Sequence, residues 1–186
     1  DELTADDIAN GETVGRLNSV NVDWFNADNF LYEGVDISVR YMYQTEQYGD
    51  FRFGVDITRI ITAERIESDS QGDTYFSDYL GNQDGFYAEW TGTVSVAWTM
   101  GDWAASVYAT YQDKLVDTFW PDLDAYVRVN ASVSYSGLYG TTITVGARNL
   151  LDEDPPFDFS TSGDGYSAGF HNPEPFFGYV RLSKEF

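Results

Sequence analysis

The stretch from Tyr126 to Ser136 reads Tyr-Val-Arg-Val-Asn-Ala-Ser-Val-Ser-Tyr-Ser, and it decides the fold class. Apolar and polar side chains alternate strictly along it. Val127, Val129 and Val133 fall on one side, and Arg128 and Ser132 fall on the other. A period of two residues is the period of a β-strand, whose side chains point alternately to opposite faces. The stretch therefore predicts a strand with one apolar and one polar face.

The same alternation recurs along most of the chain. The further segments that carry it are 34–44, 50–58, 90–100, 103–112, 142–148 and 176–186. An eighth candidate is 17–25, which could instead begin one long strand that continues through Glu33. The sequence therefore predicts an all-β protein with seven to eight antiparallel strands.

The connections between the predicted strands are of two kinds. Those at 44–49, 101–102 and 137–140 are short and contain glycine, whereas 62–89, 113–124 and 152–175 are long and acidic. Short turns at one end and long loops at the other are typical of an up-and-down transmembrane β-barrel of the bacterial outer membrane.

The composition excludes several classes of function. The 186 residues carry a net charge of −21, which argues against a nucleic-acid partner because phosphate binding needs a basic surface. Cysteine is absent, so disulfides and cysteine–zinc sites are excluded, and a single histidine leaves little for a multi-histidine metal site. No apolar run approaches the roughly 20 residues of a spanning helix.

The aromatic residues on the apolar face gather at the strand ends. We expect them to form two membrane girdles around a band of aliphatic residues. Eight residue steps separate Trp90 from Trp98, which gives a height of roughly 20 Å for a tilted strand, close to the ~25 Å apolar band of outer-membrane barrels. The predicted girdle residues are Tyr43, Phe51, Trp98, Trp103, Tyr135 and Phe186 at the short turns, and Trp90 and Tyr111 at the long loops.

The opposite face is rich in serine, threonine and glycine, and it carries half of the basic residues. We interpret it as the lining of a polar lumen in which arginines pair with carboxylates. An ordinary solvated surface is the alternative. The predicted lumen residues are Arg40, Arg52, Arg128, Arg148 and Arg181.

The C-terminal segment carries the most specific motifs. Residues 146–156 read Gly-Ala-Arg-Asn-Leu-Leu-Asp-Glu-Asp-Pro-Pro, and the following loop contains Gly165-Tyr166 and His171-Asn172-Pro173 before an aromatic-rich strand that ends in Phe186. This pattern resembles the C-terminal end of the TonB-dependent outer-membrane receptors. Residues 26–36 and the turn Gly101-Asp102-Trp103 are also similar to that family. Lys184 departs from it, because the family has an aromatic or apolar residue there.

The resemblance implies that residues 1–186 are the C-terminal portion of a 22-stranded barrel whose plug domain is absent, with 1–16 as a tail or loop. It implies energised uptake of a scarce solute such as a siderophore, cobalamin, haem or an oligosaccharide, at the outer membrane of a Gram-negative bacterium. The implied partners are the plug and the other barrel strands, the TonB–ExbB–ExbD complex, the barrel-assembly machinery that reads the C-terminal strand, and the lipid bilayer with its lipopolysaccharide. No cofactor and no enzymatic activity are expected.

Aromatic residues in the long loops are the candidates for solute binding, since rings stack on flat ligand faces. The alternative is that they pack the loops together. The candidates are Tyr75, Tyr79, Phe86, Trp120, Phe157, Tyr166 and Phe170.

No metal site is predicted. The closely spaced acids Asp152, Glu153 and Asp154 are the nearest approach to a calcium site, but they lack the spacing of a defined calcium loop. A lone histidine, His171, more often makes a turn contact than a metal ligand.

Two other functions stay open at this point. One is a self-contained eight-stranded outer-membrane barrel with a structural or adhesive role. The other is a soluble acidic β-domain that binds carbohydrate through exposed rings.

Overall fold

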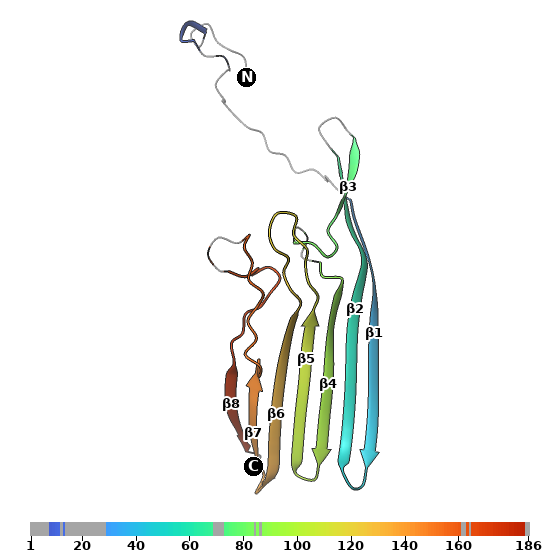
Figure 1. Cartoon of the computed structure of the whole chain (residues 1–186). Helices are drawn as coiled ribbons and strands as arrows, with labels where there is room; N and C mark the ends of the chain where they lie inside the picture. The colour runs from blue at the N-terminus through green and yellow to red at the C-terminus, as the bar shows by residue number, and fades with distance from the viewer. Residues whose placement is uncertain are drawn as a thin grey trace.

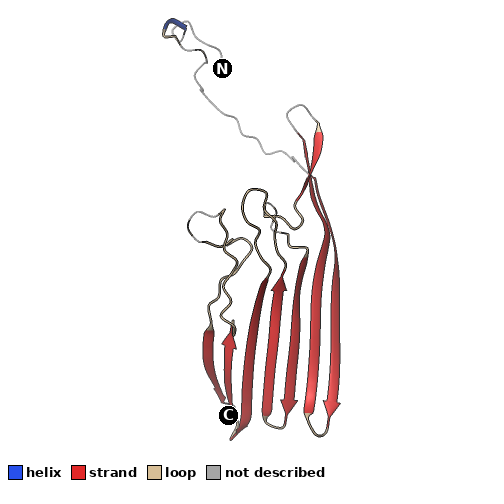
Figure 2. Ribbon diagram, viewed as in Figure 1, coloured by secondary structure: helices blue, strands red, loops and turns tan. Residues whose placement is uncertain are grey.

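The computed structural model describes residues 8–11, 13, 29–68, 73–83, 85, 87–160, 163 and 165–184, without the side chains of residues 67 and 68. Its strands form one antiparallel sheet of eight strands (Figure 1, Figure 2). The strands are β1 (Asn29–Thr45), β2 (Gly49–Ser68), β3 (Thr74–Asp78), β4 (Trp90–Met100), β5 (Trp103–Gln112), β6 (Tyr126–Leu138), β7 (Thr141–Arg148) and β8 (Phe177–Lys184).

The sheet is a meander. Its order is β1-β2-β4-β5-β6-β7-β8, so that each of these strands lies beside its neighbour in the sequence, and β3 pairs only with β2. The short turns lie at one end of the sheet and the long loops at the other, with the last described strand ending among the short turns (Figure 1). The all-β class, the antiparallel order and the seven predicted strands are confirmed.

One predicted loop was wrong. Residues 62–89 were expected to be a loop, but β2 continues to Ser68 and pairs there with β3, from Glu64 opposite Asp78 to Ser68 opposite Thr74. The strand was missed because Ile61 is an extra residue opposite β1, between Ile60 and Thr62, and this bulge interrupts the alternation of β2. The hairpin of β1 and β2 therefore extends beyond the rest of the sheet (Figure 1).

The last strand is shorter than expected. β8 begins at Phe177 rather than Phe176, whose backbone N–H donates to the Oδ1 atom of Asp152 at 2.8 Å. Lys184 lies at the short-turn end of β8, where its Nζ donates to the carbonyl oxygen of Tyr139 in the turn between β6 and β7. The candidate strand 17–25 and the predicted girdle residue Phe186 lie outside the described residues.

The register gathers the apolar side chains on one face of the sheet, as predicted. Each row of this face crosses several strands, and its members are exposed or half-buried. One row runs through Val39, Val55, Val94, Ala109 and Val129, and the next through Tyr41, Phe53, Val96, Val107, Ala131 and Ala147.

Aromatic rings end this apolar face at the short turns. Tyr43 lies opposite Phe51, with ring centroids 6.4 Å apart, and Trp103 lies opposite Tyr135, with centroids 4.7 Å apart. Trp98 donates from its indole Nε1 to the carbonyl oxygen of Tyr48 at 2.7 Å. The described members of the predicted row therefore lie at this end of the apolar face, and their role as a membrane girdle stays a proposal. They are Tyr43, Phe51, Trp98, Trp103 and Tyr135.

At the long-loop end, the apolar face is bordered by the charged residues Arg59 and Glu89. Arg59 lies in register with Val35 and Trp90, and its guanidinium sits 4.9 Å from the centre of the Trp90 ring. It also pairs with Glu89 at 2.9 Å. An arginine stacked on an aromatic ring suits a boundary between apolar and aqueous surroundings. The apolar band therefore spans Trp90 to Trp98 along β4.

The sheet is open. β1 and β8 are its two edges and do not pair with each other. A strand at an edge leaves a row of backbone N–H and C=O groups without ladder partners. Closure of a barrel by these described strands is therefore not observed.

Candidate functional site

The long loops pack against one another at one end of the sheet. Leu115 and Leu123 exchange backbone hydrogen bonds of 3.0 and 2.8 Å within loop 113–125, and both side chains are fully buried. Ala88 from loop 79–89 packs with them, and Phe170 from loop 149–176 packs against this cluster. The described loops therefore pack together into one ordered cap.

Asn149 fixes the start of the C-terminal loop. It adopts a left-handed backbone conformation, with φ 44°, and its side chain is almost completely buried. Its Nδ2 donates to the carbonyl oxygens of Glu153 at 2.9 Å and Glu174 at 2.7 Å, and its Oδ1 accepts from the N–H of Glu153 at 3.1 Å. The backbone N–H of Asn149 donates to Asn130 Oδ1 at 3.0 Å. We call this set of contacts the Asn149 clasp.

The clasp brings the two ends of the loop together over the polar face. The Glu174 carboxylate accepts one hydrogen bond from Arg128 at 3.4 Å and lies 3.0 Å from Arg148. The guanidinium of Arg148 also sits 4.8 Å from the centre of the Phe177 ring. The sequence motif around Asn149 thus positions the carboxylate of Glu174 between Arg128 and Arg148, two of the predicted lumen arginines.

The polar face carries a second set of matched charges, on β1 and β2. Arg40 donates to both carboxylate oxygens of Asp56 at 2.8 Å, and Ser38 donates to the same residue at 2.7 Å. Thr58 donates to Asp36 at 2.6 Å. Register places Arg52 and Arg181 on the same face, opposite Met42 and Thr144 respectively. The prediction that all five arginines share the polar face is confirmed, whereas its identity as a lumen stays a proposal.

A pocket of about 310 Å³ is hollowed into this face near the long loops, and we call it the polar-face pocket. The C-terminal loop lies at its edge, because Gln112 donates to the carbonyl oxygen of Phe170 at 2.9 Å and Arg128 donates to that of Asn172 at 3.4 Å. It is lined by Asp56, Thr58, Thr91, Gly92, Thr93, Thr110, Tyr111, Gln112, Tyr126 and Arg128.

Four rings gather farther along β1, and we call them the aromatic cluster. Phe30 and Tyr32 on β1 lie 6.5 Å apart with an interplanar angle of 22°, and Tyr87 packs against both, at 5.6 and 5.7 Å. Tyr79 completes the cluster, 6.4 Å from Phe30. Even-numbered positions of β1 share the face of Asp36, so this cluster stands on the same side of the sheet as the polar-face pocket.

The structure places the predicted solute-binding aromatics in several separate locations. Tyr79 joins the aromatic cluster, and Tyr75 lies on β3 rather than in a loop. Phe170 packs against the buried cluster of the loops, and Phe157 packs edge-on against Phe159. Trp120 is exposed in loop 113–125, where its backbone N–H donates to the Asp117 carboxylate. Tyr166 lies half-buried in loop 149–176, and Phe86 lies outside the described residues.

Sequence reasoning missed Phe30 and Tyr32 as candidates. Both precede the predicted strand 34–44 and lie in none of the predicted long loops, so they were not considered for binding, whereas β1 begins at Asn29. Their spacing of two residues on one strand was the available signal, because it places both rings on the same face.

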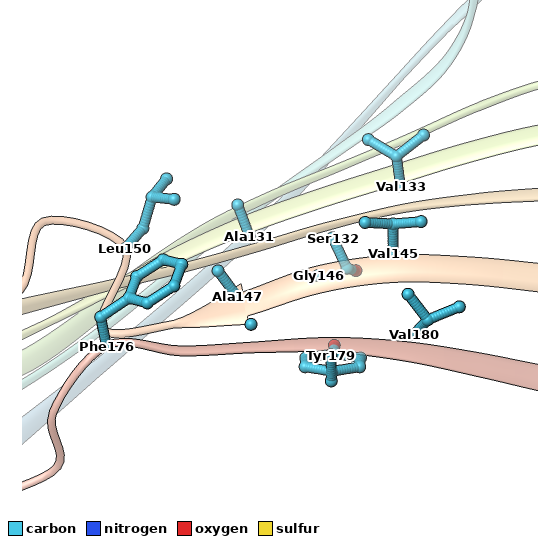
Figure 3. A pocket seen from close by; sticks show the side chains of 11 residues that line it. Ala131, Ser132, Val133, Val145, Gly146, Ala147, Leu150, Phe176, Tyr179 and Val180 are labelled. Carbon is cyan, nitrogen blue, oxygen red and sulfur yellow. The ribbon is translucent and has the colours of Figure 1, made fainter.

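A further hollow, of about 540 Å³, opens beside β7. Figure 3 shows Val133, Val145 and Val180 on the same side of the strands, with the Tyr179 side chain on the opposite side of β8. Leu150 and Phe176 bound its other end, and the small side chains of Ala131 and Ala147 form its floor (Figure 3). Its lining is mostly apolar, so it is part of the apolar face rather than a site for a polar solute.

His171 is buried beneath the loops and has unusual surroundings. Among the described residues, neither ring nitrogen has a hydrogen-bond partner. The rings of Tyr126 and Phe170 pack edge-on against it, at 5.5 and 4.7 Å. Burial lowers the pKa of His171, and the nearby carboxylate of Asp158 opposes this effect only in part.

The loops are therefore expected to loosen in acid. A histidine whose pKa is lowered by folding contributes stability that is fully present above its unfolded pKa of about 6.5 and is lost as the pH falls through the folded value. The denaturation midpoint is expected to be lower at pH 5 than at pH 7.5. The difference is expected to be smaller in His171→Gln, because glutamine cannot take up the proton. An identical pH dependence in both proteins would refute the role of His171.

Within the described residues, no group of three or more histidine or carboxylate side chains is arranged to hold a metal ion. Asp152, from the acidic run 152–154, instead accepts the backbone N–H of Phe176. No helix among the described residues is long and apolar enough to cross a membrane. The chain matches no family model, no curated protein and no solved structure.

Proposed function

We propose that this chain forms C-terminal strands and loops of a TonB-dependent receptor barrel in the outer membrane of a Gram-negative bacterium, where it serves the energised uptake of a scarce solute. The observation that carries the proposal is the exposed apolar face of the sheet. Val39, Val94 and Val145 are each about half exposed to solvent, as are many of their neighbours in the same rows. So large a continuous apolar surface requires an apolar partner, and rings at its borders favour lipid as that partner.

The composition of the polar face supports the proposal that this face lines a lumen. Three of its five arginines are paired within the sheet or with the loop that folds over it. Arg40 pairs with Asp56, and Arg128 and Arg148 pair with Glu174. Serine and threonine hydroxyls also bond across strands, including Ser106 with Ser132 at 3.0 Å and Ser134 with Thr144 at 2.9 Å. A wall of this composition suits contact with water, with a plug domain and with a passing solute.

The two unpaired edges of the described sheet support the proposal that the strands belong to a larger barrel. β1 and β8 each leave backbone groups without ladder partners, and further strands of the same receptor would supply them. The receptor would add a plug domain and contact with the TonB–ExbB–ExbD complex, and its C-terminal strand would be read by the barrel-assembly machinery. A self-contained eight-stranded barrel would require β1 and β8 to pair, and a soluble domain would require cover for the apolar face.

The size and location of the native protein test this proposal. Outer-membrane fractions are separated on a denaturing gel and probed with an antibody against the peptide 152–175. A band several times heavier than 21.0 kDa in this fraction is the expected result. A band near 21.0 kDa in the same fraction would favour the small barrel, and a signal confined to the soluble fraction would refute the membrane assignment.

A further inference from the structure

We propose that the polar-face pocket binds an uncharged carbohydrate. This inference rests on the proposed receptor function and assigns a class of solute to it. It follows from three features of the described residues, which are the hydroxyl-rich lining of the pocket, the matched charges around it and the aromatic cluster on the same side of the sheet.

The lining of the pocket supplies both donors and acceptors at close spacing. Thr91, Thr93 and Thr110 lie side by side on β4 and β5, with Thr93 directly opposite Thr110. Each threonine hydroxyl is one donor and can accept as well, and Gln112 adds an amide that has both functions. A sugar presents the same mixture of hydroxyl donors and acceptors, so the two surfaces are complementary. The volume of about 310 Å³ lies at the small end of the range for ligand sites, which suits one or two sugar rings.

The arginines in and beside the pocket are paired. Arg40, Arg128 and Arg148 each have a carboxylate oxygen within 3.4 Å. Arg40 pairs with Asp56, whereas Arg128 and Arg148 share Glu174. The carboxylate of Asp36 accepts from the Thr58 hydroxyl, and those of Glu153 and Asp154 lie near Tyr126.

This pairing selects against charged solutes. An anionic solute such as a ferric catecholate would need uncompensated cations, and the net charge of −21 would repel it further. A cationic solute would meet one carboxylate in the described pocket lining, that of Asp56, and Arg40 already pairs with it. An uncharged solute requires neither, because it can hydrogen-bond to groups whose charges are already paired.

The aromatic cluster supplies an apolar surface for the same ligand. The rings of Phe30 and Tyr32 are nearly parallel and about half exposed. Tyr87 packs against both rings, and Tyr79 packs against Phe30. The C–H-rich face of a sugar ring can pack on such rings while its hydroxyls remain in water. Because the cluster lies four or more residues along β1 from Asp36, it would contact a part of an oligosaccharide outside the pocket.

Binding to the detergent-solubilised native receptor tests the proposal. The probes are neutral cello-, malto- and xylo-oligosaccharides of six units, an oligogalacturonate of the same length as the anionic control, and ferric enterobactin and cobalamin as other receptor solutes. We expect at least one neutral oligosaccharide to bind, and the oligogalacturonate to bind at least 10-fold more weakly.

Isosteric variants locate the site. Thr93→Val with Thr110→Val removes two hydroxyls from the pocket and is expected to weaken neutral binding by about 10- to 100-fold. Thr99→Val removes a hydroxyl from the same face of β4 outside the pocket and is expected to leave binding unchanged. Arrival of each variant in the outer membrane, measured by immunoblot, confirms that it has assembled.

Failure of this inference can be told apart from failure of the receptor function. Binding of ferric enterobactin or cobalamin without any neutral oligosaccharide would overturn the carbohydrate assignment and leave the receptor function in place. Failure of every neutral probe to bind, or equal weakening by Thr99→Val and the double variant, would also overturn it. Absence of the protein from the outer membrane would instead overturn the receptor function.

Discussion

Replacing Val94 with arginine is expected to lower the ratio of folded to unfolded protein in the membrane by about 100-fold. Val94 lies on β4 in the middle row of the apolar face, with Val55 and Ala109 on either side, and half of its surface is exposed. A charge on the lipid-facing side near the bilayer midplane costs about 2–4 kcal/mol, and each 1.4 kcal/mol is a factor of ten. Urea denaturation of the protein in phospholipid vesicles measures the change.

The adjacent residue gives a matched control. Thr93 precedes Val94 on β4 but points to the polar face, where it lies opposite Asp56 and Thr110. Thr93→Arg places the same charge at the same height, beside a carboxylate, and is expected to change stability by less than about 1 kcal/mol. Equal losses from the two substitutions would mean that the faces do not differ in their surroundings, and the membrane proposal would then fall.

Replacing Asn149 with alanine is expected to open loop 149–176 about 100-fold more often. The substitution removes three side-chain hydrogen bonds from a fully buried position, and it leaves backbone groups of Glu153 and Glu174 without partners. It also places alanine in a left-handed conformation that asparagine tolerates better. Together these effects cost about 3 kcal/mol.

Limited chymotryptic cleavage measures this opening, because the loop carries Phe157, Phe159 and Tyr166, and the cleavage rate tracks the open population. Asn172→Ala is the control, since only the backbone carbonyl of Asn172 contacts Arg128. Asn149→Gly separates the two causes, because glycine accepts the left-handed backbone but restores none of the hydrogen bonds. Unchanged cleavage in Asn149→Ala would show that the clasp does not hold the loop.

The strands could be predicted where alternation is unbroken. Residues 126–136 and 34–44 alternate throughout, and both lie in strands with the expected faces. β3 could not be predicted because the bulge at Ile61 breaks the pattern of β2, and β3 itself forms only through its pairing with β2. Local sequence carries the period of a strand, but a bulge and its partner depend on the register of two segments together.

The candidate site was only partly predictable. The five arginines were assigned correctly to the polar face, because position along an alternating strand determines the face. Their partners were not, since Glu174 reaches Arg128 across 46 residues of sequence. The aromatic cluster was missed for the same reason, because Tyr79 and Tyr87 meet Phe30 only once the loop has folded.

The amino-acid sequence by itself determined the all-β class, the meander of strands, the two contrasting faces and the position of the aromatic row at the short turns. These are local properties, because the direction of each side chain follows from its place in a strand of period two. The tertiary structure alone decided the extended β1–β2–β3 hairpin, the Asn149 clasp, the charge pairs of the polar face and the pocket between them. These depend on strand register and on loop contacts between distant residues, which set which donors, acceptors and charges come within bonding distance.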